Sequence, residues 1–206
     1  MEVVDITGSR IAFLPVIRGL VSEESKVEEA FNEWGPDSVA LSISREEVDT
    51  LRRLGRKDAE LETFEEEIYV GNLEKFGEVK KPPPCFTKAL ELCIDSQIDC
   101  VGVDMTEDEY TDAYCHFVTA MEMMRESWFK RRIHSKTLNA KSPEEFVIRF
   151  DEAVNKTRGH RELEREREKV IAHRLLMLAR ERKKILAVVE LERTAGVLSA
   201  LKKKRG

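Results

Sequence analysis

The sequence predicts an α/β fold with a mainly parallel sheet of four or five strands and helices on both faces. Short apolar runs recur along the chain, and segments with helix-start signals lie between them. The runs are apolar almost throughout, which is typical of strands that are covered on both faces. Strands that alternate with helices favour a parallel sheet. We expect residues 1–206 to form a single domain, with 202–206 as a flexible basic tail.

The apolar runs place the strands. The expected strands are Ile11–Ile17, Ser38–Ile43, Ile98–Met105 and Ile185–Leu191, with a further short strand at Val3–Ile6. Pro15 has no amide hydrogen to donate to a neighbouring strand, so its strand is expected at a sheet edge or with a bulge there.

Capping residues predict where several helices begin. Ser22 precedes an acid-rich helix that runs to about Trp34 and ends at Gly35. Ser44 and Thr106 are each followed by a glutamate three residues later, which is the capping-box pattern. A further helix is expected where Ser142 precedes Pro143 and Glu145.

The middle of the chain is harder to assign. Lys80–Pro84 is expected to be a rigid extended connector before a helix at Phe86–Asp95. The preceding segment, Phe64–Val79, is either a strand around Ile68–Val70 or part of a flexible insertion.

Two long helices are expected after the third strand. In the first, large apolar residues recur at spacings of three and four and form one stripe: Tyr110, Tyr114, Phe117, Met121, Met124 and Trp128. This stripe either packs on the domain's own core or faces a partner, which would make it the interface of a homodimer.

The second long helix is expected at about His160–Arg182. Its apolar stripe consists of Leu163, Val170, Ile171, Leu175 and Leu178. Arg167 and Arg174 lie on or near the same stripe, where an arginine is costly unless it is paired or faces a solvated pocket. We expect intramolecular ion pairs here, with the acidic half as one source of partners.

Charge is distributed unevenly along the chain, whose net charge is −5. The residues up to Asp112 include 27 acidic and 12 basic side chains, whereas the residues from Ala113 onward include 13 acidic and 23 basic ones. The basic half could form a nucleic-acid face, could attract the acidic half, or could pair with a second copy. No nucleic-acid motif accompanies the basic residues, so a nucleic-acid partner is not expected.

Composition also limits the class of protein. No apolar run approaches the length of a transmembrane helix, and the first residues do not resemble a secretory signal, so no membrane association is expected. The cysteines lack a zinc-site spacing and are expected to be reduced in a cytoplasmic protein: Cys85, Cys93, Cys100 and Cys115.

A ligand site is expected where the parallel strands end, because open α/β sheets bind ligands beyond the carboxyl ends of their strands. The corresponding segments are Ile17–Leu20, Ser42–Ser44, Asp104–Thr106 and Glu190–Arg193.

The same strand ends resemble motifs of the TraB/PrgY pheromone-shutdown family, relatives of the TIKI metalloproteases and the EreA/ChaN group. The family's G-T-A-H-V-S, acidic helix and P-D-V-V-A-V-E-L are similar to I-R-G-L-V-S at 17–22, an acidic helix, and P-D-S-V-A-L-S-I at 36–43. The family's closing V-V-G-A-G-H-V-x-G-I is similar to V-V-E-L-E-R-T-A-G-V at 188–197, and its E-R-N-x-x-M-A helix is faintly similar to His173-Arg174 and the following Met177 and Ala179.

The departures from the family pattern bear directly on function. The family's two histidines fall on Leu20 and Arg193, and its strand-end glutamate falls on Ser42. Leucine cannot bind a metal ion, and arginine stays protonated and repels a cation. The resemblance therefore implies a degenerate member that keeps the scaffold but lacks the metal chemistry, with no cofactor and no catalytic residues.

We expect a non-catalytic protein that binds a ligand or partner in this crevice. The candidate lining residues are Arg18, Ser42, Asp104, Arg174, Glu190, Glu192 and Arg193. Arginines there suit an anionic small molecule or a peptide carboxylate. Two alternatives remain: a divergent metal-dependent hydrolase that uses Asp104, Glu190 and Glu192 on a divalent cation, and a nucleic-acid-associating protein that uses the basic half, including Lys202–Arg205.

Overall fold

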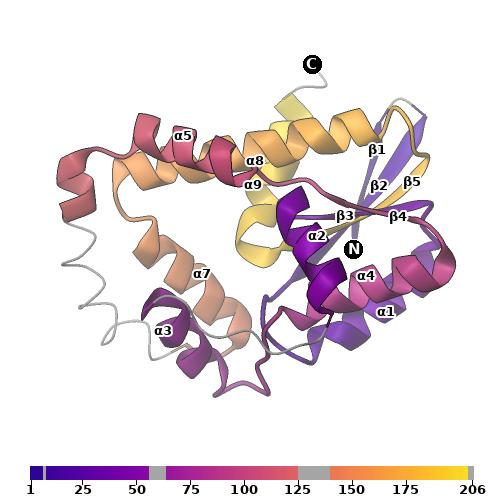
Figure 1. Ribbon diagram of the computed structural model, residues 1–206, viewed down its shortest axis with the longest axis horizontal. Coiled ribbons are helices and arrows are strands. Elements are labelled where there is room, and N and C mark those ends of the chain that lie inside the picture. Colours follow the sequence, from indigo (N-terminus) through magenta and orange to yellow (C-terminus); the bar gives the residue numbers. More distant parts are fainter. Residues whose placement is uncertain (7, 56–63, 125–139, 204–206) are drawn as a thin grey trace.

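A five-stranded sheet lies on one side of the molecule, at the right in Figure 1. The computed structural model describes residues 1–6, 8–55, 64–124 and 140–203. The strand order is β1-β2-β5-β3-β4, in which β1 pairs antiparallel with β2 and all other neighbours are parallel. The strands are β1 (Glu2–Ile6), β2 (Ser9–Val16), β3 (Ser38–Leu41), β4 (Asp99–Gly102) and β5 (Lys184–Glu190). The predicted α/β fold with a mainly parallel sheet is confirmed.

Helices cover both faces of this sheet. They are α1 (Glu23–Trp34), α2 (Arg45–Leu54), α3 (Phe64–Leu73), α4 (Pro84–Ser96), α5 (Glu107–Phe117), α7 (Pro143–Val154), α8 (Arg158–Leu178) and α9 (Leu191–Lys203). Successive strand residues point to opposite faces. In β5, Leu186 and Val188 pack with α1, α2 and α4, whereas Ile185, Ala187 and Val189 pack with α8 and α9.

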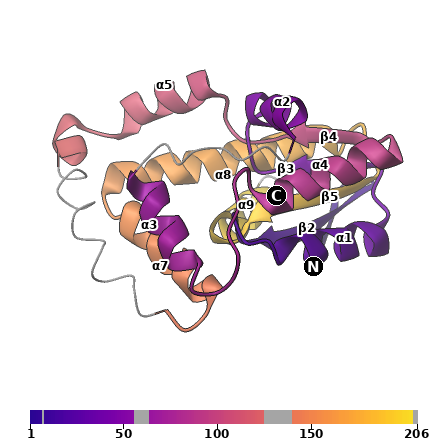
Figure 2. The same ribbon diagram turned by 60° about the horizontal axis from the view of Figure 1, so that its bottom comes forward.

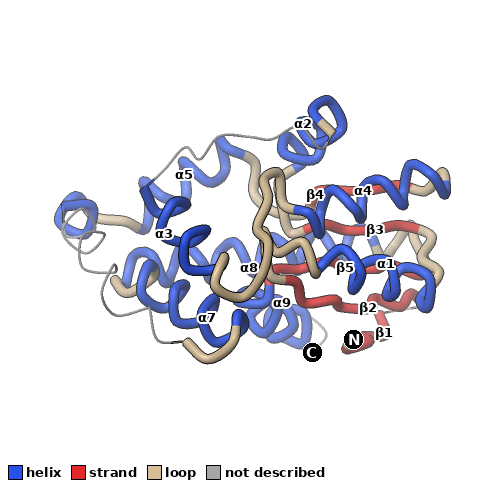
Figure 3. The backbone as a smooth tube through the Cα atoms, turned by 90° about the horizontal axis from the view of Figure 1, so that it is seen from below, coloured by secondary structure: helices blue, strands red, loops and turns tan. Residues whose placement is uncertain are grey.

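A third apolar cluster lies beyond one end of the sheet. Ile17 and Leu20, just after β2, pack there against Tyr69 and Leu73 of α3 and Phe146 of α7. Figures 2 and 3 show α3 beside α7, on the side of the molecule away from the strands. These two helices therefore enclose the space into which the carboxyl ends of β2 and β5 point.

Pro15 shows why a proline is tolerated in an inner strand. The Arg10 amide donates to the Lys183 carbonyl at 2.8 Å, so the alternate residues of β2 turn their amides toward β5. The nitrogen of Pro15 therefore faces the β1 side, where the pairing stops at Phe13. β2 is an inner strand, but at Pro15 it is locally an edge.

The predicted helix starts are confirmed. Both capping boxes form, and in the first the Ser44 hydroxyl accepts from the Glu47 amide at 3.1 Å while the Glu47 carboxylate accepts from the Ser44 amide at 2.8 Å. The Thr106 box is equivalent, and the Ser142 hydroxyl caps α7. Ser22 precedes α1 without a side-chain cap, and Gly35 ends that helix in the left-handed conformation.

Neither alternative for the segment after residue 64 is correct, because Phe64–Leu73 forms helix α3. Tyr69 and Leu73 are one helical turn apart and are both buried against the α7 side. Burial of this face on α7 accounts for a helix where the β-branched and aromatic run suggested a strand.

The prediction of one continuous apolar stripe from Tyr110 onward is wrong. Helix α5 ends at Phe117, and Val118 adopts an extended conformation. The Thr119 hydroxyl then accepts from the Glu122 amide at 3.3 Å, which caps a new helical turn. Met121 and Met124 lie on that second turn, and Trp128 lies outside the described residues.

The start of α8 fixes this break. The Glu122 carboxylate accepts from the Gly159 amide at 2.8 Å, and a Cβ atom on Gly159 would lie 2.5 Å from the Phe117 carbonyl oxygen. The chain therefore leaves the line of α5 where α8 approaches it.

The C-terminal end also differs from its prediction. Lys202 and Lys203 belong to α9 rather than to a tail, and the Lys202 ammonium lies 3.4 Å from the Glu2 carboxylate. Residues 204–206 lie outside the described residues. Within the described ranges, no helix has the length and apolar character needed to span a bilayer.

Candidate functional site

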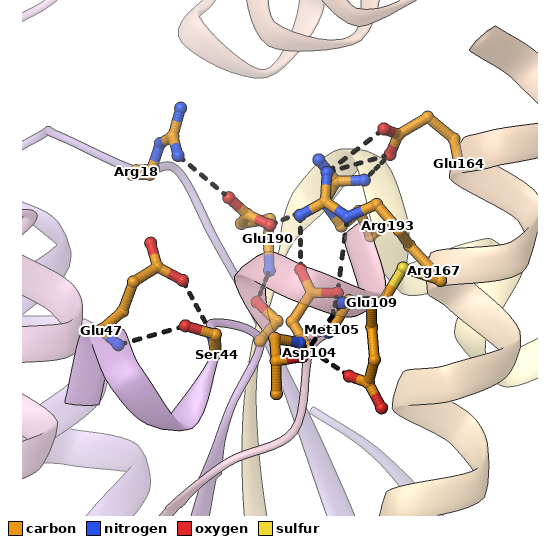
Figure 4. Close-up of polar contacts among 12 residues, drawn as sticks. Arg18, Ser44, Glu47, Asp104, Met105, Glu109, Glu164, Arg167, Glu190 and Arg193 are labelled. Carbon is orange, nitrogen blue, oxygen red and sulfur yellow. Dashed lines mark hydrogen bonds and ion pairs between the residues drawn. The ribbon is translucent and has the colours of Figure 1, made fainter. Parts of the chain in front are cut away.

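The strand ends converge around Glu190, the last residue of β5 (Figure 4). The Glu190 amide donates to the Ser42 hydroxyl at 3.1 Å, which ties the end of β5 to the residue just after β3. Both side chains are buried. Ser42 is therefore a structural link beneath the site rather than part of an open surface.

Glu190 lies between two arginines, as Figure 4 shows. The Arg193 Nε donates to Glu190 Oε2 at 2.7 Å, because α9 begins directly after β5 and returns Arg193 to the strand end within one turn. The Arg18 guanidinium approaches Glu190 Oε1 from the other side, at 3.7 Å. Only the Arg193 contact has the length of a hydrogen bond.

Asp104, which follows β4, has a separate arginine. Arg167 of α8 binds both of its carboxylate oxygens, with Nε 3.4 Å from Oδ1 and Nη2 closer to Oδ2. The Met105 amide also donates to Oδ1, at 2.7 Å. This arrangement confirms the expected ion pairing of Arg167 with the acidic half.

Glu164 joins the two ion pairs. Its carboxylate accepts from Arg167 Nη1 at 3.2 Å and also contacts Arg193 Nη1. Asp104, Arg167, Glu164, Arg193 and Glu190 thus form one continuous network. Such buried charges are tolerated only because each has an opposite charge within reach.

Arg174 lies apart from this network. Its Nη2 donates to both carboxylate oxygens of Glu109, at 2.7 and 2.6 Å, and its Nη1 contacts the Asp104 carbonyl oxygen. It pairs with the acidic half, as expected, but it lines none of the three cavities at the strand ends. Arg174 therefore fixes the start of α5 instead of facing a ligand.

A cavity of about 300 Å³, which we name the strand-end cavity, opens above the network. One part of its wall is apolar or aromatic, and another part is charged. The residues that bear on function are Arg18, Tyr69, Phe150, Asp151, Leu163, Arg167, Glu192 and Arg193. Two neighbouring cavities, of about 360 and 220 Å³, share Arg167 and Arg18 with it, respectively.

Burial changes the protonation of the strand-end glutamates. Desolvation raises the pKa of Glu190 to about 7, although Arg18 and Arg167 oppose the rise. Desolvation, with a contribution from the charge of Glu190, raises the pKa of Glu192 to about 8. Oε2 of Glu192 is buried without a hydrogen-bond partner in the described part of the structure. Glu190 is thus paired with arginines, whereas one carboxylate oxygen of Glu192 has no hydrogen-bond partner among the described residues.

The strand-end rule brought together most of the residues chosen from the sequence. Arg18, Glu192 and Arg193 line the strand-end cavity, and Asp104 lines its neighbour. Ser42 and Glu190 lie beneath them. The convergence expected from parallel strands is therefore observed, although two of the chosen residues, Ser42 and Glu190, lie beneath the cavities and not on their walls.

Several lining residues were not identified from the sequence. Tyr69 comes from α3, for which the sequence left two alternatives, and Asp151 comes from α7, for which the sequence predicted only the start. The sequence predicts Arg167 as a paired or pocket-facing arginine, but not Glu164, which lies three residues earlier on the same face of α8. That spacing was a usable signal, whereas nothing in the sequence placed α3 and α7 over the strand ends.

The residues at the positions of the family histidines do not form a metal site. Leu20 is buried in the apolar cluster with Tyr69 and Leu73, and Arg193 is bound to two carboxylates. Among the described residues, no group of three or more histidine, cysteine or acidic side chains is arranged to hold a metal ion. The four cysteines are free, and Cys115 is the exposed one.

Comparison with known proteins adds no relative: neither a family model nor a curated protein matches the chain.

Proposed function

We propose that this protein binds a small anionic ligand or a peptide carboxylate in the strand-end cavity and carries out no reaction there. The observation that carries the proposal is the state of Arg18. Its side chain is 44% exposed, whereas those of Arg167 and Arg193 are 18% and 12% exposed. All three arginines line the cavity, and of the three Arg18 has the longest contact with a carboxylate.

The surroundings of Arg18 suit recognition by a forked guanidinium. Its guanidinium carbon lies 5.9 Å from the centre of the Tyr69 ring, and the Tyr69 hydroxyl donates to the Arg18 carbonyl oxygen at 3.0 Å. α3 therefore restrains the backbone of Arg18, while the guanidinium group of Arg18 faces the cavity. An arginine held in this way suits bidentate binding of a carboxylate.

We propose further that the chain is a degenerate TraB-like protein. The donor set supports the loss of metal chemistry, because Leu20 offers no ligand atom and Arg193 carries a positive charge. The alternative hydrolase would need Asp104, Glu190 and Glu192 around one cation. Asp104 and Glu190 are instead each bound to an arginine.

A thermal-shift screen of small carboxylates and short peptides tests the proposal. A ligand that raises the melting temperature of the parent protein should have no effect on Arg18→Gln. Arg53→Gln, on the exposed side of α2, is the matched control and should respond like the parent. Equal responses of all three proteins would show that the ligand binds elsewhere.

The cytoplasmic location and the homodimer are retained as proposals. Met121 and Met124 are 70% and 77% exposed, so the second helical turn offers an apolar surface to a second copy. Sedimentation of the parent and of Met121→Glu/Met124→Glu tests this, since a dimer formed there should dissociate in the variant.

A further inference from the structure

Two acidic side chains on the wall of the strand-end cavity lie outside the network of arginines and carboxylates. Three arginines, Arg18, Arg167 and Arg193, face the network carboxylates Asp104, Glu164 and Glu190. These groups pair with one another, and the acidic side chains of Asp151 and Glu192 remain on the cavity wall.

Arginines act on these two acidic groups from a distance, Arg193 on Asp151 and Arg18 on Glu192, but none forms an ion pair with them in the described residues. Among the described residues, no lysine or arginine nitrogen lies within ion-pair distance of Asp151 or Glu192. In the described residues, the partner of the Asp151 carboxylate is neutral: the Asn155 side-chain amide donates a hydrogen bond to it at 2.9 Å. Glu192 Oε2 is buried and has no hydrogen-bond partner in the same part of the chain. A buried carboxylate in this state favours a positively charged group.

We propose that the ligand is a small zwitterion with an apolar portion, whose carboxylate binds Arg18 and whose ammonium group binds Glu192 and Asp151. This inference rests on the proposed function and names its ligand class. Arg18 and the two acidic residues line one cavity, so a single small molecule can meet both charges. Val147, Phe150 and Leu163 form the apolar wall on which its remaining part would pack.

Protonation supports the same assignment. Burial raises the pKa of Asp151 and raises the pKa of Glu192 to about 8, so Glu192 holds a proton over much of the neutral range. The charged groups that act on Glu192 are Glu190 and Asp151, which favour its protonated form, and Arg18, which opposes it. An ammonium group beside Glu192 favours the ionised form, so binding should release a proton at pH 7.

Calorimetry with three matched probes tests the proposal: phenylalanine, 3-phenylpropionate and 2-phenylethylamine. Phenylalanine should bind about ten-fold more tightly than either single-charge analogue, because each charge contributes one charge-assisted interaction. Titrations at pH 7 in phosphate and in Tris should give different heats for phenylalanine, since the released proton is taken up by the buffer. The heats for 3-phenylpropionate should not depend on the buffer in this way.

Variants separate the two charges. Glu192→Gln should bring phenylalanine binding down to the level of 3-phenylpropionate and abolish proton release, while 3-phenylpropionate binding is unchanged. Arg18→Gln should weaken the binding of both probes that carry a carboxylate, phenylalanine and 3-phenylpropionate. Glu152→Gln, on the exposed side of α7, is the matched control and should behave like the parent.

The outcomes distinguish the two proposals. If 3-phenylpropionate binds as tightly as phenylalanine, the ammonium site is wrong and the carboxylate-binding function stands. If 2-phenylethylamine binds most tightly, Arg18 has no role and both proposals fail. If none of the three binds at millimolar concentration, both proposals are also overturned.

Discussion

The buried ion pair between Asp104 and Arg167 illustrates how single residues hold this site together. The Asp104 side chain is 4% exposed, so its charge depends on Arg167 for compensation. Each partner comes from a different part of the chain, and the pair joins the end of β4 to the middle of α8. Breaking such a pair costs more than the pair itself contributes, because an uncompensated charge is left behind.

Replacing Arg167 should therefore be strongly destabilising. Arg167→Met should lower the free energy of unfolding by about 3–5 kcal/mol, because it leaves Asp104 buried without its partner. Arg165→Met, two residues earlier on the exposed side of α8, removes a surface ion pair with Glu162 and should cost less than about 1 kcal/mol. Urea unfolding measures both changes.

The double variant checks the mechanism. Asp104→Asn/Arg167→Met should be less destabilised than the sum of its single substitutions, because the neutral amide no longer needs a cation. Additive effects would show that Arg167 stabilises the fold through packing alone.

Glu192 should make stability fall as the pH rises. Burial raises its pKa from 4.5 to about 8, so the folded protein holds this proton more tightly than the unfolded chain does. The stabilisation from this group is complete below about pH 4.5 and is lost as the pH rises through about 8. Glu192→Gln cannot ionise and should lose this slope.

The expected difference is measurable by urea unfolding at pH 5 and pH 8. Relative to the parent, Glu192→Gln should gain stability with rising pH by up to about 1.4 kcal/mol per pH unit, the value for one proton. Glu192→Asp keeps an ionisable carboxyl and should keep the parent's slope. Parallel curves for the parent and Glu192→Gln would contradict the prediction.

At the scale of elements, the close approach of β4 to the start of α2 requires a glycine. A Cβ atom on Gly102 would lie 2.5 Å from the Ser44 carbonyl oxygen and 2.7 Å from the Arg45 nitrogen. Both neighbours are backbone atoms, so they cannot move aside without shifting the helix. Ser44 and Asp104 line one cavity, and its shape depends on this contact.

Gly102→Ala should therefore destabilise the protein by about 1–3 kcal/mol, as overpacking does in a filled interior. Gly71→Ala is the control, because a Cβ at Gly71 meets nothing within 4 Å. It lies inside α3, where alanine should instead add about 0.5–1 kcal/mol. Thermal unfolding of both variants would reveal the opposite signs. A loss of stability in both would show that crowding is not the cause at Gly102.

The elements that the sequence predicted well carry local signals. β2, β3 and β5 are apolar over most of their length because helices cover both of their sides. Ser44 and Thr106 have their glutamates at the spacing that a capping box needs. The predictions for α3 and α5 were wrong for a different reason: contacts with distant parts of the chain decide these helices. The face of α3 is decided by α7, far along the chain, and α5 stops where Gly159 of α8 approaches it.

The site shows the same division. Parallel strands place their carboxyl ends at one edge, so Asp104 and Glu190 could be brought together from the sequence alone. The sequence does not predict which arginine is left to bind a ligand, since this depends on the ion pairs that the tertiary fold forms. Arg193 and Arg174 are bound to carboxylates, whereas Arg18 is the more exposed.

At the scale of the whole molecule, the acidic and basic halves of the chain form ion pairs with each other. Arginines of the basic half bind carboxylates of the acidic half in three places: Arg167 with Asp104, Arg174 with Glu109 and Arg182 with Asp99. Lys202 of α9 also lies near Glu2 of β1. Of the three explanations for the charge pattern, attraction between the halves is the one with contacts in the described residues.

This pairing predicts that the basic half does not bind nucleic acid. A protein that neutralises several phosphates loses affinity steeply as salt rises, because counterions are released from the nucleic acid. Here arginines that would make such contacts already neutralise carboxylates of the same chain. Fluorescence polarisation with labelled single- and double-stranded 20-mers should therefore show no saturable binding at 150 mM NaCl. Saturable binding that weakens about a thousand-fold between 50 and 200 mM salt would require several phosphate contacts. It would show that the basic half has an outward face that the internal ion pairs do not account for.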